Sequence, residues 1–412
     1  LNVPTGKTFY MTKFSDKLAN LMFPASVIPR SLTSSFAKRP KTNFNEVSFD
    51  LTEDVFTVKW KEEGDEVVIV VPDGIETIGA NAFKKWFEGW KKKITITLPE
   101  SVTSIENNAF AWIDATYYFP SSLKHIGDGA FAHCTKLLEF HISPKITHIE
   151  ENPFYDCWSL KITSESSRFV VIDNMLIDKK KKILIAYCGK EEEVNVPDCV
   201  THIGGSAFFH CIYLEKINIP DSVKTIGNEA FSYCNSLEEI NLSNSLTSIG
   251  SYTFWHCEEL KIINIPDSVT TIGESAFKDC TSLKEIHLSD SLIKIENYAF
   301  KNCESLKTIN FPNSVKVIGK KAFNNCSKLK EIEMPDSIIY IGKGCFQYCE
   351  SLKKVNIPRS MTFIEDEVFD ECNALKKVTI PDTIISIGSS AFGESTKYNI
   401  PDSVVNIEDG WF

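Results

Sequence analysis

Thirteen cysteines are the side chains in this sequence best suited to chemistry, because thiolates attack electrophiles, bind soft metals and form disulfides. Ten of them share one spacing, three residues after a phenylalanine: Cys134, Cys157, Cys211, Cys234, Cys257, Cys280, Cys303, Cys326, Cys349 and Cys372. If these positions stack about 4.8 Å apart, neighbouring Cα atoms come within disulfide range, but the side chains point in parallel and not toward each other. We therefore predict a ladder of buried thiols that act as small apolar filler, with disulfides or metal binding as the alternatives.

Motifs for catalysis or metal binding are missing. No Cys-x-x-Cys pair exists, and Cys345 with Cys349 is a weak metal signal. The histidines occupy variable positions without a zinc-protease or nucleophile-elbow motif: His125, His133, His141, His148, His202, His210, His256 and His287. Recurring Asp-Ser pairs such as Asp267-Ser268 are typical of turns in which both side chains satisfy their own backbone. We expect no catalytic residue, no metal and no cofactor.

Phenylalanine marks an internal repeat that must position any such group. From Phe208 to Phe392, successive phenylalanines of a mostly Ala-Phe phrase are always 23 residues apart. One unit read from Phe254 has the pattern F-x-x-C-x-x-L-x-x-I-x-I-P-x-S-V-x-x-I-G-x-x-A. Its apolar spacing fits neither one amphipathic helix nor one half-buried strand, so each unit must turn several times and send side chains inward. Stacked units then share one continuous core.

Local signals predict how each unit is built. The segment L-x-x-I-x-I at 260–265 has the spacing of a leucine-rich-repeat strand, whose alternation buries the isoleucines and exposes Asn264. Pro266 ends this strand, because proline has no amide hydrogen to donate to the ladder. A second short extended piece at 269–272 ends in a turn at Gly273. The predicted fold class is a β-rich leucine-rich-repeat solenoid of short strands and turns, a curved right-handed coil with 23-residue repeats.

These repeats resemble the BspA-like leucine-rich-repeat family, also called the Treponema pallidum type. The phrase IPDSVTTIGESAFKDCTSLKEI at 265–286 is similar to that family's repeat almost letter for letter, and the resemblance covers about residues 67–412. Known members of the family are mostly surface-exposed or secreted proteins of host-associated bacteria and protozoa, implicated in adhesion to host proteins and cells. The resemblance therefore implies an extracellular or cell-surface binding protein.

Departures from the period predict the domain organisation. Residues 1–66 show no repeat and are interpreted as an N-terminal cap or attachment segment, because the open end of a solenoid must be covered. Residues 67–160 form a first block of repeats and 199–412 a second. Between them, 161–198 contain two apolar runs on either side of Asp178 and four lysines, which indicates the inserted β-hairpin that the resemblance also implies.

Composition and charge narrow the class of protein. The chain of 412 residues is 43% hydrophobic and 24% charged, and it has no apolar run of the roughly 18 residues that a membrane helix needs. A net charge of −11 argues against sequence-independent binding to nucleic acid. No leader opens the chain at Leu1, and the missing initiator Met leads us to expect that any targeting segment has been removed. We expect a secreted protein that does not insert into a membrane, with a monomer as the favoured state.

Positions that vary between repeats are the candidate binding surfaces. The exposed strand column is interpreted as a solvated face: Asn218, Asn241, Asn264, His287, Asn310, Glu333, Asn356 and Thr379. Two aromatic groups favour ligand binding, because surface aromatic residues are enriched at interfaces. The candidate ligand-binding residues are His210, Tyr233, Tyr252, Trp255, His256, Tyr340 and Phe363. The alternative is that these side chains only pack against the hairpin or a neighbouring side chain.

Three functions compete at this point. The leading hypothesis is a non-catalytic binding protein that adheres to a protein or glycan of a host cell or extracellular matrix. The second is a structural spacer that presents another domain. The third, a glycan-active enzyme, would need a cluster of acids in a pocket that breaks the repeat, and the acids here recur with the repeat.

Overall fold

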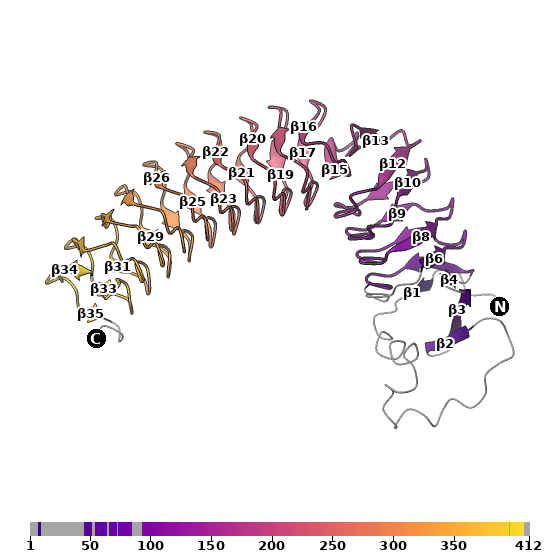
Figure 1. The fold of residues 1–412 in the computed structure, drawn as a ribbon, viewed down its shortest axis with the longest axis horizontal. Helices are drawn as coiled ribbons and strands as arrows, with labels where there is room; N and C mark the ends of the chain where they lie inside the picture. The colour runs from indigo at the N-terminus through magenta and orange to yellow at the C-terminus, as the bar shows by residue number, and fades with distance from the viewer. Residues whose placement is uncertain are drawn as a thin grey trace, which may run out of the picture. The chain divides into compact units, whose positions relative to one another are not determined.

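The protein is a parallel β-solenoid, which confirms the fold class predicted from the repeat. The computed structural model describes residues 7–9, 45–51, 54–63, 66–71, 73–84, 93–394 and 396–407, with side chains described from Val67 onward. The chain divides into two compact units, residues 1–180 with 186–189 and residues 181–185 with 190–412. Within each unit, short strands follow one another turn by turn (Figure 1). The described residues form strands and turns only, so none of them lies in a helix that could cross a membrane.

Two ladders of strands build the first unit. One ladder joins, in order, β1 (Lys7–Phe9), β5 (Ile75–Ile78), β7 (Ser104–Ile105), β9 (His125–Ile126) and β11 (His148–Ile149). The other joins β2 (Asn45–Leu51), β3 (Asp54–Glu63), β4 (Glu66–Val70), β6 (Lys93–Thr97) and β8 (Ala115–Tyr118), and is followed by β10 (Glu139–Ile142) with β12 (Lys161–Ser164). The β2–β3 and β3–β4 pairs are antiparallel, whereas β4, β6 and β8 are parallel. A cap role for residues 1–66 stays a prediction, as do the other domain boundaries.

The second unit repeats the same two ladders. One begins at residues 183–185, the part of β15 (Ile183–Tyr187) that lies in this unit. It continues through β17 (His202–Ile203) and β19 (Thr225–Ile226), then β21 (Ser248–Ile249), β23 (Thr271–Ile272), β25 (Lys294–Ile295), β27 (Val317–Ile318) and β29 (Tyr340–Ile341), then β31 (Phe363–Ile364), β33 (Ser386–Ile387) and β35 (Asn406–Ile407). The other consists of β16 (Glu193–Asn195), β18 (Lys216–Asn218) and β20 (Glu239–Asn241), β22 (Ile262–Asn264) with β24 (Glu285–His287), β26 (Thr308–Asn310), β28 (Glu331–Glu333) and β30 (Lys354–Val355), and β32 (Lys377–Val378) with β34 (Lys397–Tyr398). Within each ladder the pairing is parallel with like residues opposite, as between Ile263 and Ile286.

The turn that begins at Phe254 shows why the sequence coils in this way. Strand β22 alternates exposed, buried and exposed residues, so that Ile263 points inward and Asn264 outward as predicted. At Gly273, a Cβ atom would lie 2.7 Å from the carbonyl carbon of Gly250 in the preceding turn. Glycine fits at this position because the backbone of the preceding turn lies so close that a side chain here would require one of the two backbones to shift.

Columns of identical side chains fill the interior. The isoleucine column is buried throughout: Ile226, Ile249, Ile272, Ile295, Ile318, Ile341, Ile364 and Ile387. The leucine column, from Leu214 to Leu375, is equally buried. Phenylalanine rings stack face to face from Phe208 to Phe392, with neighbouring centroids 5.0–5.6 Å apart. Each buried ring contributes roughly 1.5–3 kcal/mol by leaving water, so this column is a main source of stability.

A third side of the coil pairs turn to turn without forming a strand. Around Phe277, the amides of Ser275, Phe277 and Asp279 donate to carbonyl oxygens of the next turn at 2.9, 2.7 and 2.8 Å. Ser275 and Asp279, two residues before and two residues after the phenylalanine, have positive φ values of 54° and 63°. This conformation points alternate amides toward the next turn of the stack. Buried backbone groups therefore have hydrogen-bond partners even though this side of the coil forms no strand.

The predicted ladder of buried thiols is present, but its role is more than apolar filler. Nine of the ten cysteines in the column are buried, Cys211 is half-buried, and all are free thiols. Each buried thiol donates to the carbonyl oxygen of the phenylalanine in the preceding turn, as Cys280 Sγ does to Phe254 at 3.1 Å. The thiol, a weak donor, thus gives the buried phenylalanine carbonyl an additional hydrogen-bond partner.

The recurring Asp-Ser turns also link neighbouring turns of the solenoid. The Ser337 hydroxyl donates to the Val315 carbonyl of the preceding turn at 2.8 Å. The carboxylate of Asp336 accepts from the amide of Arg359, one turn further on, at 2.8 Å. The expectation that these side chains mainly satisfy their own backbone is corrected: cross-turn bonds dominate because the next backbone lies one strand spacing away.

The inserted hairpin has a different turn from the one predicted. Strands β13 (Phe169–Ile172) and β14 (Met175–Asp178) pair antiparallel, with Ile172 opposite Met175. The turn is therefore Asp173-Asn174, both at positive φ, and not the lysine run after Asp178. Asp and Asn tolerate this conformation and favour the tight turn of a two-residue hairpin. The lysine run instead separates β14 from β15.

Removing one ring from the phenylalanine stack tests its energetic role. Phe277→Ala should lower the free energy of unfolding by about 3–5 kcal/mol, because it leaves a cavity between Phe254 and Phe300. Urea denaturation measures this change. Asn264→Ala on the exposed strand is the control and should change stability by less than about 0.5 kcal/mol. A loss below about 1 kcal/mol for Phe277→Ala would contradict the role assigned to the stack.

The buried thiols should resist modification and ionisation. Burial raises the pKa of Cys134 from 9.0 to about 12. Since the unfolded thiol ionises at the lower value, the free energy of unfolding should fall as the pH rises from about 9 toward 12. In the native state a thiol reagent should react rapidly with the exposed Cys199, and Cys199→Ser should remove that fast phase. Rapid native-state modification of the buried column would show that the thiols are accessible.

Candidate binding surface

Residues two positions after the repeat phenylalanines from Phe110 to Phe369 share a left-handed backbone conformation. Where this position holds Asp or Asn, as in Asp279, Asn302 and Asn325, the side chain tolerates positive φ. His210, Tyr233 and His256 occupy the same position with φ values of 58°, 61° and 58°. A left-handed conformation costs a bulky residue roughly 1–2 kcal/mol, so the backbone does not explain why aromatic residues are found there. Such a cost is typical of positions whose side chains have another role.

The structure brings five of the predicted residues into one cluster in the second unit. Their side chains are half-buried: His210, Tyr233, Tyr252, Trp255 and His256. The Tyr233 ring stacks on His256 with centroids 4.8 Å apart, and it lies 4.9 Å from Trp255. Tyr252 meets Trp255 edge to face at 5.5 Å, and His210 meets Tyr233 at 6.0 Å. We name this group, together with Phe209, which contacts Tyr233 at 5.7 Å, the aromatic patch.

Asp279 anchors one end of the aromatic patch. Its Oδ2 accepts from the Trp255 indole at 2.9 Å and lies 3.4 Å from His256 Nε2. Asn302 donates to Oδ1 at 2.6 Å, and the Lys278 ammonium lies 3.6 Å from Oδ2 and over the Trp255 ring. Burial by itself would raise the pKa of Asp279, but the hydrogen bonds from Asn302 and Trp255 and the nearby Lys278 ammonium lower it below its ordinary value. The carboxylate therefore stays charged and holds the indole in place.

The polar side of the surface continues along the same column. Asn325 donates to the Asn302 side chain at 3.1 Å, so amide follows carboxylate in successive turns. At the other end, burial and the charges of Asp279 and Glu229 raise the pKa of Tyr233, which keeps its hydroxyl protonated. The patch thus joins apolar rings to a row of hydrogen-bonding groups, the combination that protein interfaces use.

The second predicted group is smaller. Tyr340 and Phe363 begin strands β29 and β31, and their ring centroids lie 6.0 Å apart. Both side chains are half-buried. Burial, the charge of Glu365 and a hydrogen bond to that residue raise the pKa of Tyr340. The hydrogen bond to Glu365 is a sufficient structural reason for a tyrosine at position 340, so this pair is a weaker candidate for binding than the aromatic patch.

The first unit contains a second group of the same design that the sequence analysis did not identify. Trp112 and His133 stack with centroids 3.7 Å apart, and His133 Nδ1 contacts the Asp156 carboxylate. All three residues lie two positions after a phenylalanine and have positive φ. Both units therefore carry aromatic rings in this column that end on an aspartate. Reading the column through the first block as well as the second would have found it.

A shallow depression borders the exposed strand column. It is lined by residues at the ends of β18, β20 and β22, among them Asn218, Asn241 and Asn264. These asparagines are exposed, which confirms that the column faces solvent. Amide side chains in a depression can donate and accept hydrogen bonds at once.

Three stretches of the chain, residues 67–184, 181–307 and 293–412, match the model of the BspA type leucine rich repeat region. Together they cover most of the sequence. No curated protein matches the chain significantly.

Solved structures of bacterial leucine-rich-repeat proteins are similar to this one. A leucine-rich-repeat protein from Eubacterium ventriosum has 20% identity and a TM-score of 0.55, over 89% of this chain and 99% of that chain, which supports the fold. A leucine rich cell surface protein from Faecalibacterium prausnitzii has 31% identity over 63% of this chain, with a TM-score of 0.46. The match spans 60% of the length of that protein. A leucine-rich-repeat protein from Bacteroides ovatus has 25% identity and a TM-score of 0.47, over 85% and 99% of the two chains.

Neutralising Asp279 tests whether it organises the aromatic patch. Asp279→Asn should lower the free energy of unfolding by about 1–3 kcal/mol and should change the emission of Trp255, because the indole loses a charged acceptor. Because the pKa of Asp279 is lowered in the folded state, its stabilisation is present above the ordinary aspartate pKa of about 4 and is lost as the pH falls through the folded value. This loss of stability at low pH is the acid limb of the stability curve, and the variant should make it less steep. Fluorescence relative to Trp255→Phe isolates the indole signal.

The matched control for this variant is Asp290→Asn, which changes an exposed aspartate in an Asp-Ser turn of the same unit. It should leave both Trp255 emission and the acid limb unchanged. Equal effects of the two variants would show that Asp279 contributes only general surface charge.

Proposed function

The chain belongs to the BspA-type leucine-rich-repeat family, and we propose that it is a non-catalytic cell-surface or secreted protein that binds a macromolecular partner through its aromatic patch. The observation that carries this proposal is a half-buried set of packed rings: Tyr233 and His256 stack at positions where the backbone disfavours them, and Trp255 lies beside Tyr233. Family membership supports a location outside the cell. The regular stack supplies a rigid support, and the varied columns supply the specificity.

The chemistry of the patch favours a protein partner. Trp and Tyr are the residues that most often dominate binding energy, and they do so when a partner completes their burial. The rings already contact one another and Trp255 is hydrogen-bonded to Asp279, so little side-chain freedom is lost on binding. Lys278 and Asp279 add one charge of each sign beside the rings, which suits a mixed polar rim. A glycan is the second partner class that the test distinguishes.

Binding assays with single variants test this proposal. The chain should be screened against arrays of extracellular-matrix proteins and of glycans, and each ligand found should be titrated with Trp255→Ala and Tyr233→Ala. We expect a saturable protein ligand and a weakening of about 30-fold or more for each variant, the change that corresponds to 2 kcal/mol at an interface centre. Thermal unfolding of each variant confirms that the solenoid remains folded.

Tyr348→Ala is the matched control, because Tyr348 occupies the same left-handed column, is exposed and lies outside the aromatic patch. It should bind within about twofold of the unsubstituted chain. Loss of binding with Trp112→Ala alone would move the site to the first unit. Absence of any saturable ligand, or equal effects of Tyr348→Ala and Trp255→Ala, would refute the proposal.

A further inference from the structure

Two short strands of the first unit bring a pair of histidines side by side. His125 in β9 and His148 in β11 are directly opposite in the parallel register, so their side chains leave the same face one turn apart. The imidazole rings stack with centroids 5.1 Å apart and an interplanar angle of 14°. Glu150 follows His148 by two residues and points to the same side, since alternate residues of an extended chain share a face.

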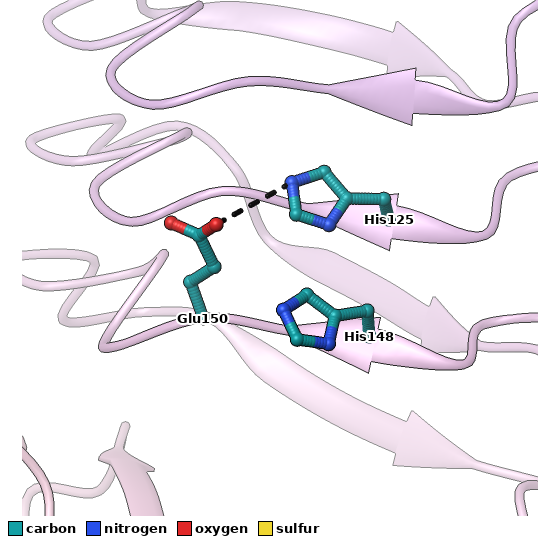
Figure 2. A group of neighbouring side chains, drawn as sticks. All are labelled: His125, His148 and Glu150. Carbon is teal, nitrogen blue, oxygen red and sulfur yellow. Dashed lines mark ion pairs between the residues drawn. The ribbon is translucent and has the colours of Figure 1, made fainter.

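The glutamate completes a compact set of ligating atoms. Figure 2 shows its side chain rising from its own turn beside both rings, with the carboxylate directed at His125. Glu150 Oε1 lies 3.8 Å from His125 Nε2, and the amide of Asp128 donates to Oε2 at 3.4 Å. One ligating atom from each of the three residues lies within 4.8 Å of the other two. Among the described residues, this is the group of His, Cys, Asp or Glu side chains in which three ligating atoms lie this close to one another.

A glutamate at the same place in other turns has a single ordinary partner. Glu106 accepts from the Ser104 hydroxyl at 2.6 Å, and Glu296 pairs with the Lys294 ammonium at 2.7 Å. One hydroxyl or one cation is thus sufficient to satisfy this carboxylate. At Glu150 the neighbouring side chains are two imidazoles, which offer two nitrogen lone pairs beside one negative charge. That set is suited to a cation rather than to a simple ion pair.

We propose that His125, His148 and Glu150 bind a divalent cation of the zinc class. Imidazole nitrogen suits Zn²⁺, Ni²⁺ and Cu²⁺, whereas Mg²⁺ and Ca²⁺ prefer oxygen ligands alone. Bond lengths of about 2.0–2.2 Å around a tetrahedral ion place ligating atoms roughly 3.4 Å apart. The three side chains reach that spacing by side-chain rotations that move each ligating atom by about 1 Å, which the exposed His148 and the half-buried His125 and Glu150 permit.

The site is open to solvent on one side. The side chains of His125 and Glu150 are 23% and 35% exposed, so an ion reaches them without unfolding of the turn. Three protein ligands leave a fourth position for water or for a donor from a partner molecule. At the place in the preceding turn equivalent to Glu150, Gly127 has no side chain, and a Cβ there would lie 2.5 Å from the amide nitrogen of Asn107. No second side chain from that position competes for the ion.

Zinc titration of the untagged chain tests the proposal. All proteins carry Cys199→Ser, because this exposed thiol would bind zinc itself. Calorimetric titration with ZnCl₂ should show one site per chain, and His125→Gln, His148→Gln and Glu150→Gln should each weaken it by about tenfold or more. His287→Gln is the matched control, because His287 is an exposed strand histidine whose Nε2 lies 2.9 Å from Glu285 without a second imidazole beside it. It should bind zinc within about twofold of the parent.

A second measurement locates the ion. Diethyl pyrocarbonate modifies accessible imidazoles, and zinc should protect His125 and His148 while His287 continues to react. The proposal is overturned if the parent takes up no zinc, if any one of the three ligand variants binds as tightly as the parent, or if zinc protects His287 equally. Circular dichroism of each variant shows whether its fold is retained.

Discussion

Stacking of identical side chains in register is the constraint on which this structure depends. A single turn buries almost nothing, but a turn whose Phe, Ile, Leu and Cys lie directly on those of its neighbours closes a dry interior. The phenylalanine rings set the spacing, and parallel pairing holds every other column in the same register. Eight consecutive periods in the second unit are equal, but equal length is not required for this register: Phe83, Phe110 and Phe131 stack although 27 and 21 residues separate them.

The same constraint accounts for polar residues that occur in every turn. Because the neighbouring backbone is always one strand spacing away, side chains find their hydrogen-bond partners across turns. Cys280 donates to Phe254 and Ser337 to Val315 in this way. Recurrence of a chemically capable side chain therefore indicates a structural role in this fold. Functional residues are expected where a column departs from its usual types.

Departures of that kind occur in both units. Aromatic rings replace Asp or Asn in the left-handed column, and each run of rings ends on an aspartate, Asp156 in one unit and Asp279 in the other. Histidines occupy the first positions of β9 and β11 and stack on each other. The same position in later turns holds a single histidine, His202, and otherwise varied residues such as Thr225, Lys294 and Tyr340, so no second pair of histidines is adjacent there among the described strands. The interior determines where these positions lie, and the outward side chains are free to differ from turn to turn. This separation is what allows one scaffold to present distinct surfaces.

Much of this molecule follows from its sequence alone. Equal spacing places equivalent residues of successive turns on top of one another. The repeat period, the buried columns, the strand at 262–264 and the clustering of Tyr233, Trp255 and His256 therefore follow directly from the amino-acid sequence. The hairpin turn at Asp173-Asn174, the cross-turn bonds of cysteine and serine, the anchoring role of Asp279 and the meeting of His125, His148 and Glu150 were decided by the tertiary structure. These features depend on which atoms of adjacent turns come within about 3–5 Å, and a spacing of residues along the chain does not specify side-chain direction or distance at that scale.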